Sequence, residues 1–582
     1  MRNNPEPIVG SPQPMKRGLP LPSSHSPSSA GPGVLDQSDL RSSCEARAQP
    51  PFLARFSPFA SWLEREPAIC LGALTFLFVT TTVARATRMM WFDELTTFYL
   101  ARMDSISSAW RAVCNGADLQ PPLMFVLAHF SQKLAGANEV ATRLPCILGF
   151  LVACGCVFVF IRRRSGTVFA LCGTVLILLT GAYRYAYEAR PYALVLAGAA
   201  LALTSWQSAT EPRRGWLSIW GIAAGLWIAL ASQCYAVVLA IPFGAGELAR
   251  TLQRKKIDWP VWIAFGMSAS AIAFYPPLIK LHDGGFVGSH TLFGVATRSL
   301  WTITERIVGG AGYVIALIMV LAAWLGSGDR QGHSKYPKIP GYEAVALGLL
   351  AATPIFLALL IAEIHSAIFY RYSLAAVLGI VALVARAFYL VAHGDSRIGA
   401  VVLLLLTAVF VERFISDAFA QPDSRPAARL MYASATDTPT DTNESVPGHR
   451  LLSVVPGDLP LVISDPFRFV QVVHYAPPAL AARTWYLMDS KAALRYTTTN
   501  FFEVSLPVLF RTLPMPGHLA PYSTFVSPGR RFFIYTSANA FDWLMAQLGS
   551  DNTQLRFAGR FGDAVLFDAC VECRPGAGND SK

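Results

Sequence analysis

Residues 67–94 read PAICLGALTFLFVTTTVARATRMMWFDE, a long apolar segment followed after a few residues by two adjacent acids. The apolar part, Pro67 to Ala84, is close to the roughly 20 residues with which a helix crosses a hydrocarbon core. If this segment leaves the cytoplasm, Asp93 and Glu94 emerge on the opposite side, at the boundary between membrane and water. The stretch therefore predicts a membrane protein with paired carboxylates placed for chemistry on a lipid-borne substrate.

The composition of the whole chain supports a polytopic α-helical membrane protein. Of its 582 residues 53% are hydrophobic and 15% are charged, against roughly 25% charged in soluble domains, and the mean hydropathy is +0.41. The net charge of +11 comes from short basic clusters between apolar runs, where membrane proteins place their cytoplasmic loops. We therefore expect a lipid bilayer as partner and no nucleic acid.

About eleven segments are long and apolar enough to be membrane-spanning helices. They are Pro67 to Ala84, Val140 to Ile161, Thr167 to Tyr183, Pro191 to Gln207, Trp216 to Ser232, Cys234 to Leu248, Trp259 to Ile279, Ile307 to Leu325, Tyr342 to Ala362, Ile368 to Val391 and Ile398 to Ile415.

Basic loops orient these spans. Four clusters fall on one side of the predicted topology: Arg162 to Arg164, Arg213 and Arg214, Arg254 to Lys256, and the stretch that holds Arg330, Lys335 and Lys338. The positive-inside rule makes that side cytoplasmic, together with the N-terminus. The loops 85–139, 184–190 and 363–371 and the C-terminal region then lie outside the cytoplasm.

Leu123 to Leu134 is an ambiguous apolar segment. It follows Pro121 and Pro122 and is short for a span, which suits an interfacial or re-entrant helix begun by the prolines. Counting it as a span would invert everything downstream. We place it in the outer loop, and the sequence leaves open whether it is interfacial or membrane-spanning.

Changes of composition divide the chain. Residues 1–50 are rich in Pro, Ser and Gly without a secretory signal, which predicts disorder. After residue 450 short β-type runs alternate with helical stretches and end in a hairpin. Cys570 and Cys573 are placed for a local disulfide. The predicted organisation is a disordered cytoplasmic tail (1–66), a transmembrane catalytic domain (67–416) with the outer loop 85–139, a linker (417–450), a small extracytoplasmic α/β domain (451–572) and a tail (573–582).

Asp93 and Glu94 have two compatible interpretations. Acids at a helix N-terminus satisfy unpaired backbone N–H groups and complement the helix dipole, so the pair could simply cap a helix. Paired acids in an interfacial loop could equally carry acid–base chemistry. Residue types alone do not separate the two.

Further motifs follow in a fixed order, all on the predicted outer side. They are Trp91-Phe92-Asp93-Glu94, then Gln120-Pro121-Pro122-Leu123 ending in His129, then Thr142-Arg143-Leu144-Pro145, then Tyr187-Glu188-Ala189-Arg190-Pro191-Tyr192, and finally Arg371-Tyr372. In this order the chain resembles GT-C-type glycosyltransferases over roughly residues 67–391. It is most similar to the family 39 group of protein O-mannosyltransferases, bacterial aminoarabinose transferases and RgtA/B/C/D-like bacterial enzymes. Gln120 departs from the pattern, because relatives usually have His before the two prolines.

This resemblance implies transfer of a hexose or pentose from a polyprenyl-phosphate donor to a hydroxyl of a lipid, glycan or protein acceptor. The reaction would be inverting, on the outer face of a bacterial-type inner (plasma) membrane. Asp93 occupies the position of the general base, and Glu94 would orient Asp93 or the acceptor. A glycosidase would instead need two carboxyl groups flanking the sugar, which adjacent residues are poorly placed to provide.

Cations at the outer ends of spans suit the phosphate of such a donor. Arg190 and Arg371 could bind it, with Tyr192 and Tyr372 as hydroxyl donors, although arginines at helix ends also anchor helices by snorkelling. Glu188 could pair with Arg190 or contact the sugar.

Three more positions in the outer loop and its neighbourhood are possible acceptor or loop contacts, namely Gln120, His129 and Arg143. Arg143 could anchor its span or neutralise the acidic pair. A lone His in a short apolar helix is more often packed than catalytic.

No cofactor or metal site is predicted, and the participation of a divalent metal stays open. The main alternative function is a transporter or flippase of lipid-linked sugars, which would place ionisable groups near the membrane midplane. A lipid-linked polymerase or ligase is a third possibility, and a sensor whose C-terminal domain binds a ligand is a fourth, weaker one.

Overall fold

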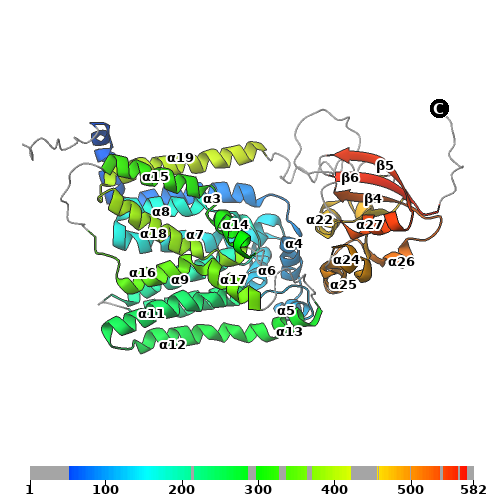
Figure 1. Cartoon of the computed structure of the whole chain (residues 1–582), viewed down its shortest axis with the longest axis horizontal. Coiled ribbons are helices and arrows are strands. Elements are labelled where there is room, and N and C mark those ends of the chain that lie inside the picture. The colour runs from blue at the N-terminus through cyan, green and yellow to red at the C-terminus, as the bar shows by residue number, and fades with distance from the viewer. Residues whose placement is uncertain are drawn as a thin grey trace, which may run out of the picture. The chain divides into compact units, whose positions relative to one another are not determined.

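The computed structural model describes residues 51–211, 215–285, 296–326, 336–363, 370–420, 458–497, 500–537, 542–561 and 564–572, with positions 452 and 455. Helices make up the first part of the chain, drawn from blue to yellow in Figure 1, and a sheet follows, whose strands β4, β5 and β6 are drawn in red. The predicted fold class, a polytopic helical protein with a small C-terminal α/β region, is confirmed.

The helical elements before the sheet are η1 (Pro51–Phe56), α2 (Ser57–Arg65), α3 (Pro67–Ala86), α4 (Phe92–Ala101), α5 (Ile106–Cys114), α6 (Leu123–Ala135), α7 (Glu139–Ser165), α8 (Thr167–Leu179), η2 (Gly181–Tyr187), α9 (Tyr192–Ala209), α10 (Trp216–Ser232), η3 (Cys234–Leu239), α11 (Ala240–Arg254), α12 (Trp259–Ser268), η4 (Ala269–Phe274), α13 (Tyr275–Gly285), α14 (Ala296–Val308), α15 (Ala311–Gly326), α16 (Gly341–Ala351), α17 (Thr353–Glu363), η5 (Tyr370–Ser373), α18 (Ala376–Val391) and α19 (Ser396–Ala420).

Within the described residues, six helical segments are long and apolar enough to cross a membrane, and up to nine if each bent pair counts as one span. The bends are 75° between α8 and η2, 68° between α14 and α15, and 53° between α16 and α17. Two shorter apolar helices, α10 and α18, complete the set. Each predicted span overlaps one of these helices or bent pairs, and the first two residues of the span Ile368 to Val391 lie outside the described residues.

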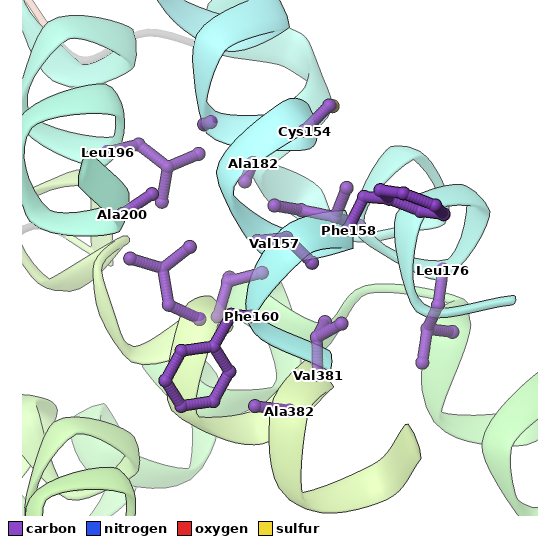
Figure 2. Packing of buried hydrophobic residues seen from close by; sticks show 14 of the residues in the cluster. Cys154, Val157, Phe158, Phe160, Leu176, Ala182, Leu196, Ala200, Val381 and Ala382 are labelled. Carbon is purple, nitrogen blue, oxygen red and sulfur yellow. The ribbon is translucent and has the colours of Figure 1, made fainter. Parts of the chain in front are cut away.

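The helices pack through a continuous apolar core. Figure 2 shows part of it, with Val157 and Phe160 of α7, Ala200 of α9 and Val381 of α18 among the buried side chains. Close helix contacts use small residues, as membrane helices commonly do. A Cβ added at Gly198 of α9 would lie 2.4 Å from the Gly225 carbonyl oxygen of α10, so only glycine permits this approach.

Residues 51–65 differ from the predicted disordered tail, because they form η1 and α2. Leu53, Ala60 and Leu63 are buried in the same core as the spans, and Pro58 lies in the first turn of α2, where a missing N–H is tolerated. Composition does not predict these helices, because a few apolar residues on one face are enough to dock a helix. The predicted tail up to residue 50, most of the predicted linker and the tail from 573 lie outside the described residues.

The C-terminal α/β domain has a six-stranded sheet with strand order β3-β2-β1-β4-β6-β5. β1, β2, β3 and β4 pair in parallel, and β4, β6 and β5 pair antiparallel, so the predicted terminal hairpin of β5 and β6 is confirmed. The strands are β1 (Leu461–Ile463), β2 (Thr484–Met488), β3 (His518–Pro521), β4 (Arg531–Ser537), β5 (Gln554–Phe561) and β6 (Ala564–Cys570), and the helices are α22 (Pro466–Tyr475), α23 (Pro478–Ala481), α24 (Ser490–Thr497), α25 (Phe501–Thr512), α26 (Tyr522–Phe525) and α27 (Trp543–Ser550).

Side chains that alternate along the strands fill two cores. Leu461 and Ile463 of β1 face one core and Val462 faces the other, as the pleat requires. The first of these cores also contains Phe92 and Tyr99 of α4, which brings this domain against the helix that carries the acidic pair. Cys570 is disulfide-bonded, and its predicted partner, Cys573, lies outside the described residues.

Candidate active site

Asp93 and Glu94 occupy the first turn of α4, which begins after the extended residue Trp91. Acids in this turn complement the positive end of the helix dipole. Glu94 also accepts the Trp91 N–H at 3.4 Å, the carboxylate half of a capping box. The helix-cap interpretation therefore holds for Glu94.

Glu94 is fully buried in a bidentate ion pair with Arg143 of α7. Arg143 Nε and Nη2 each lie 2.7 Å from a carboxylate oxygen of Glu94, and both side chains have 0% exposure. Arg143 also donates to the carbonyls of Ala86 and Arg88 at 2.7 Å. Burial raises the pKa of Glu94, while Arg143, Arg88 and the Ala189 N–H lower it. The net direction is downward, which favours the ionised carboxylate.

Glu94 also contacts the backbone of the loop that precedes α9. Glu94 Oε1 accepts the Ala189 backbone N–H at 2.7 Å, next to Arg190. One carboxylate thus ties α4 to α7 and to the loop before α9, so the elements that carry Asp93, Arg143 and Arg190 keep their places relative to one another.

Asp93 lies beside two arginines from distant parts of the chain. Its Oδ2 atom is 3.7 Å from Arg190 Nε and 3.6 Å from Arg371 Nη1, and its side chain keeps 18% exposure. Burial raises the pKa of Asp93 above its ordinary value, while Arg190 and Arg371 lower it by less. Asp93 is therefore the more basic and more accessible of the two adjacent acids.

Arg190 connects Asp93 with a second acid, Asp118. Asp118 is not among the predicted site residues. Arg190 Nη1 donates to Asp118 Oδ2 and to the Asp93 carbonyl, each at 3.1 Å. A sequence signal was available, because Asp118 stands two residues before Gln120 in the outer loop. The arrangement compensates one buried cation with two carboxylates.

Arg371 of η5 is surrounded by aromatic rings. Its guanidinium carbon lies 5.7 Å from the ring centres of Trp91 and Tyr192 and 5.8 Å from that of Tyr372, distances at which a cation is attracted to a ring face. Tyr372 in turn stacks on Tyr235, with ring centroids 4.5 Å apart. The rings hold this charge beside Asp93.

Among the described residues, the buried donors around this cluster that have no hydrogen-bond partner include Arg190 Nε, the Tyr192 hydroxyl and Trp91 Nε1. Buried polar groups are normally paired, so unsatisfied donors close to two cations suit a ligand that is anionic and rich in acceptor oxygens.

Glu188 is buried and its ion pairs are with Arg184 at 3.3 Å and Arg88 at 3.6 Å. Burial raises the pKa of Glu188, and the nearby Glu94 raises it further. Arg88 lies between the two acids, 3.8 Å from Glu94. Arg88 and Arg184 were not among the predicted site residues.

Gln120 and His129 are both buried. His129 Nδ1 is 2.8 Å from the Ala101 carbonyl oxygen, so it joins α6 to the end of α4 and has a packing role at that contact. Gln120 lies just before α6. Within the described residues, no group of three or more His, Cys, Asp or Glu side chains could hold a metal ion.

A known family model matches a segment of the chain that includes part of this site. Residues 119–280 match the family model of dolichyl-phosphate-mannose-protein mannosyltransferase. The predicted family resemblance is confirmed. The matched segment includes Gln120, Arg143, Glu188 and Arg190, and with the apolar helices it supports a membrane glycosyltransferase. Asp93 and Arg371 lie outside the matched residues.

Solved structures are similar over most of their length. ArnT from Cupriavidus metallidurans, bound to undecaprenyl phosphate, is 13% identical with a TM-score of 0.38, over 87% of this chain and 99% of that one. The Archaeoglobus fulgidus oligosaccharyltransferase in complex with Zn and sulfate is 11% identical with a TM-score of 0.40, over 86% of this chain and 73% of that one. Both TM-scores are below 0.5, so nothing about this site follows from them. No curated protein matches the sequence.

Proposed function

We propose that this protein is an integral-membrane glycosyltransferase that moves a sugar from a polyprenyl-phosphate carrier to an acceptor hydroxyl, with Asp93 as general base. The observation that carries the proposal is the placement of Asp93. It is a partly exposed carboxylate between Arg190 and Arg371. Beside it, the Tyr192 hydroxyl and Trp91 Nε1 are buried and have no hydrogen-bond partner among the described residues. A base and a phosphate-binding group therefore stand next to each other.

Asp93 would accept the proton of the acceptor hydroxyl. As that proton leaves, the acceptor oxygen forms its bond to the anomeric carbon, the bond from that carbon to the phosphate oxygen breaks, and its electron pair stays on the phosphate. One base suffices for this displacement, which inverts the anomeric centre. The raised pKa of Asp93 suits this role, because a carboxylate held by strong salt bridges is a weaker base.

Arg190 and Arg371 would stabilise the charge that grows on the departing phosphate. Guanidinium groups match phosphate geometry, and donors placed before the reaction are the largest single source of transition-state stabilisation in many enzymes. The Tyr192 hydroxyl and Trp91 Nε1 would gain acceptors in the phosphate oxygens. Tyr372 would help to hold Arg371 rather than contact the donor, since its ring lies beside that guanidinium.

Glu94 would hold Asp93 in position. Among the described residues, the ion pairs and hydrogen bonds of Glu94 are with Arg143, Arg88, the Trp91 N–H and the Ala189 N–H, and it is fully buried. This environment favours the orienting role predicted for Glu94 over contact with the acceptor. Glu188, paired with Arg184 and Arg88, would balance charge at the same place.

The matched family's description names dolichyl-phosphate mannose, a polyprenyl-type phosphate sugar, which supports the donor class. A lipid, glycan or protein hydroxyl would be the acceptor, on the extracytoplasmic face of a bacterial-type inner membrane. That orientation rests on the basic clusters of the predicted cytoplasmic loops. Transport of lipid-linked sugars ranks second, because Asp93, Arg190 and Arg371 lie in elements that precede the spans or connect them.

The proposed function is tested by incubating the purified, lipid-embedded protein with a panel of polyprenyl-phosphate sugars and candidate acceptors. The expected product is an acceptor heavier by one sugar, formed only with a matching donor. Vectorial movement of intact donor across the bilayer without any heavier acceptor would contradict transfer and favour the transporter.

The pH dependence of sugar transfer reports on the ionisation of Asp93 and on the effect of Arg371 on its pKa. Asp93 acts only when ionised, so activity is present above its folded-state pKa and is lost as pH falls through it. Arg371→Gln removes a cation that lowers this pKa, so the acid limb of kcat should move to higher pH. The check is the midpoint of that limb, compared with Arg111→Gln, an exposed arginine of α5. A midpoint that stays in place or moves to lower pH would contradict the assignment.

A further inference from the structure

The C-terminal α/β domain contacts the backbone just before Asp93 through one tyrosine hydroxyl. Tyr475, the last residue of α22, accepts the Met90 N–H at 2.8 Å and donates to Glu139 Oε1 at 3.2 Å. All three residues are buried. Burial raises the pKa of Tyr475, so the phenol keeps the proton that it donates. One hydroxyl therefore joins three elements, namely α22, the segment before α4, and the start of α7.

A second polar contact repeats this tie. Gln471, one helical turn before Tyr475, donates from Nε2 to the Met90 carbonyl at 3.2 Å. Residues four apart lie on the same face of a helix, so α22 holds both the N–H and the carbonyl of Met90. The backbone three residues before the proposed base is thereby fixed at both polar groups.

Aromatic contacts hold α4 on the same side. Phe92 meets the edges of Phe467 and Phe502, with ring centroids 5.5 and 5.8 Å apart. Two turns further along α4, the Tyr99 hydroxyl lies 2.8 Å from His474 Nδ1. Phe92 and Tyr99 are seven residues apart and share one face of the helix. Asp93 follows Phe92 directly, so the position of its carboxylate depends on how this face is seated.

We infer that Tyr475 is a positioning residue for Asp93, and that the C-terminal domain serves transfer by holding the segment Met90–Phe92 in the geometry that the base requires. This inference rests on the proposed function. Tyr475 touches neither Asp93 nor the two arginines in the contacts described above. It acts through the backbone of Met90 and through the seating of α4.

The test is Tyr475→Phe, which deletes the hydroxyl and keeps the ring. A small displacement of a catalytic group costs up to roughly 100-fold in rate. We expect kcat of Tyr475→Phe to fall about tenfold, which lies within that limit. The donor KM should stay unchanged, because Arg190 and Arg371 are untouched. The number of binding sites for polyprenyl phosphate per protein, measured in the same preparation, should equal that of wild type.

The number of polyprenyl-phosphate binding sites per protein separates a positioning effect from a loss of folded protein, because misfolding would lower kcat and the number of sites together. Tyr522→Phe is the matched control. Tyr522 is also buried in the C-terminal domain, and its hydroxyl donates to Asp551 at 2.7 Å, so kcat should not change. Gln471→Met is a second variant, which should lower kcat in the same direction and does not depend on the fold of Tyr475→Phe.

The outcomes are distinct. Reduced kcat with a full complement of sites supports the inference. Wild-type kcat in Tyr475→Phe and Gln471→Met, or a loss proportional to the number of sites, overturns it while leaving the proposed function in place. If Asp93→Asn transfers sugar as well as wild type does, the proposed base fails, and the positioning of Asp93 fails with it.

Discussion

Asp93→Asn is expected to lower kcat for sugar transfer by about 10²–10⁴-fold, the range that positioned general bases contribute. Asparagine keeps the shape of the side chain and cannot accept the proton. Removing the negative charge also leaves Arg190 and Arg371 less compensated, so the donor KM should stay the same or fall. The measurement is steady-state transfer with purified protein in lipid, fitted for kcat and KM separately.

Asp104→Asn is the matched control for that experiment, since Asp104 is an exposed acid in the same outer loop. It should transfer sugar at the wild-type rate. Full retained kcat in Asp93→Asn would remove Asp93 as the base. A raised donor KM with unchanged kcat would instead assign Asp93 to binding.

Arg143→Met is expected to destabilise the protein by about 3–5 kcal/mol, the usual cost of removing one partner from a buried ion pair. Glu94 would lose its bidentate partner in a site of 0% exposure and would retain Arg88, 3.8 Å away, as a counter-charge. The carbonyls of Ala86 and Arg88 would lose their Arg143 donor. The measurement is the denaturant dependence of unfolding in detergent, with Arg111→Met as the exposed control, which should change stability by less than about 0.5 kcal/mol.

The double variant Glu94→Gln and Arg143→Met tests the cause of that loss. It removes both charges, so it should be clearly more stable than Arg143→Met alone, because most of the cost is a buried carboxylate that has lost its bidentate partner. Equal stability of the single and double variants would show that the loss comes from cavity formation or the lost backbone contacts, not from the buried charge.

Local signals in the sequence were sufficient for the spans and for part of the site. Apolar length predicted the helices, and the basic loops placed Asp93, Arg190 and Arg371 on one side. The structure brings these three together. From the sequence, Arg143 could be either a helix anchor or a partner of the acidic pair. In the structure it is a partner of Glu94, with two contacts of 2.7 Å.

Contacts between distant residues could not be predicted in the same way. The pairing of Asp118 with Arg190 and the contact of Tyr475 with Met90 join residues 72 and 385 positions apart, and no periodicity or composition encodes them. The break at Thr180, whose extended backbone separates α8 from η2, was also missed, because apolar length alone reads both sides as one span.

The most direct test of the account is a stoichiometric one, with a radiolabelled polyprenyl-phosphate sugar that the panel identifies as donor. Carrier release and sugar incorporation into the acceptor are measured in the same reaction, for wild type and Asp93→Asn. If Asp93 is the base for sugar transfer, we expect equal amounts of released carrier and glycosylated acceptor in wild type, and a parallel loss of both in Asp93→Asn. Carrier release without incorporation, at a rate that Asp93→Asn does not change, would contradict it.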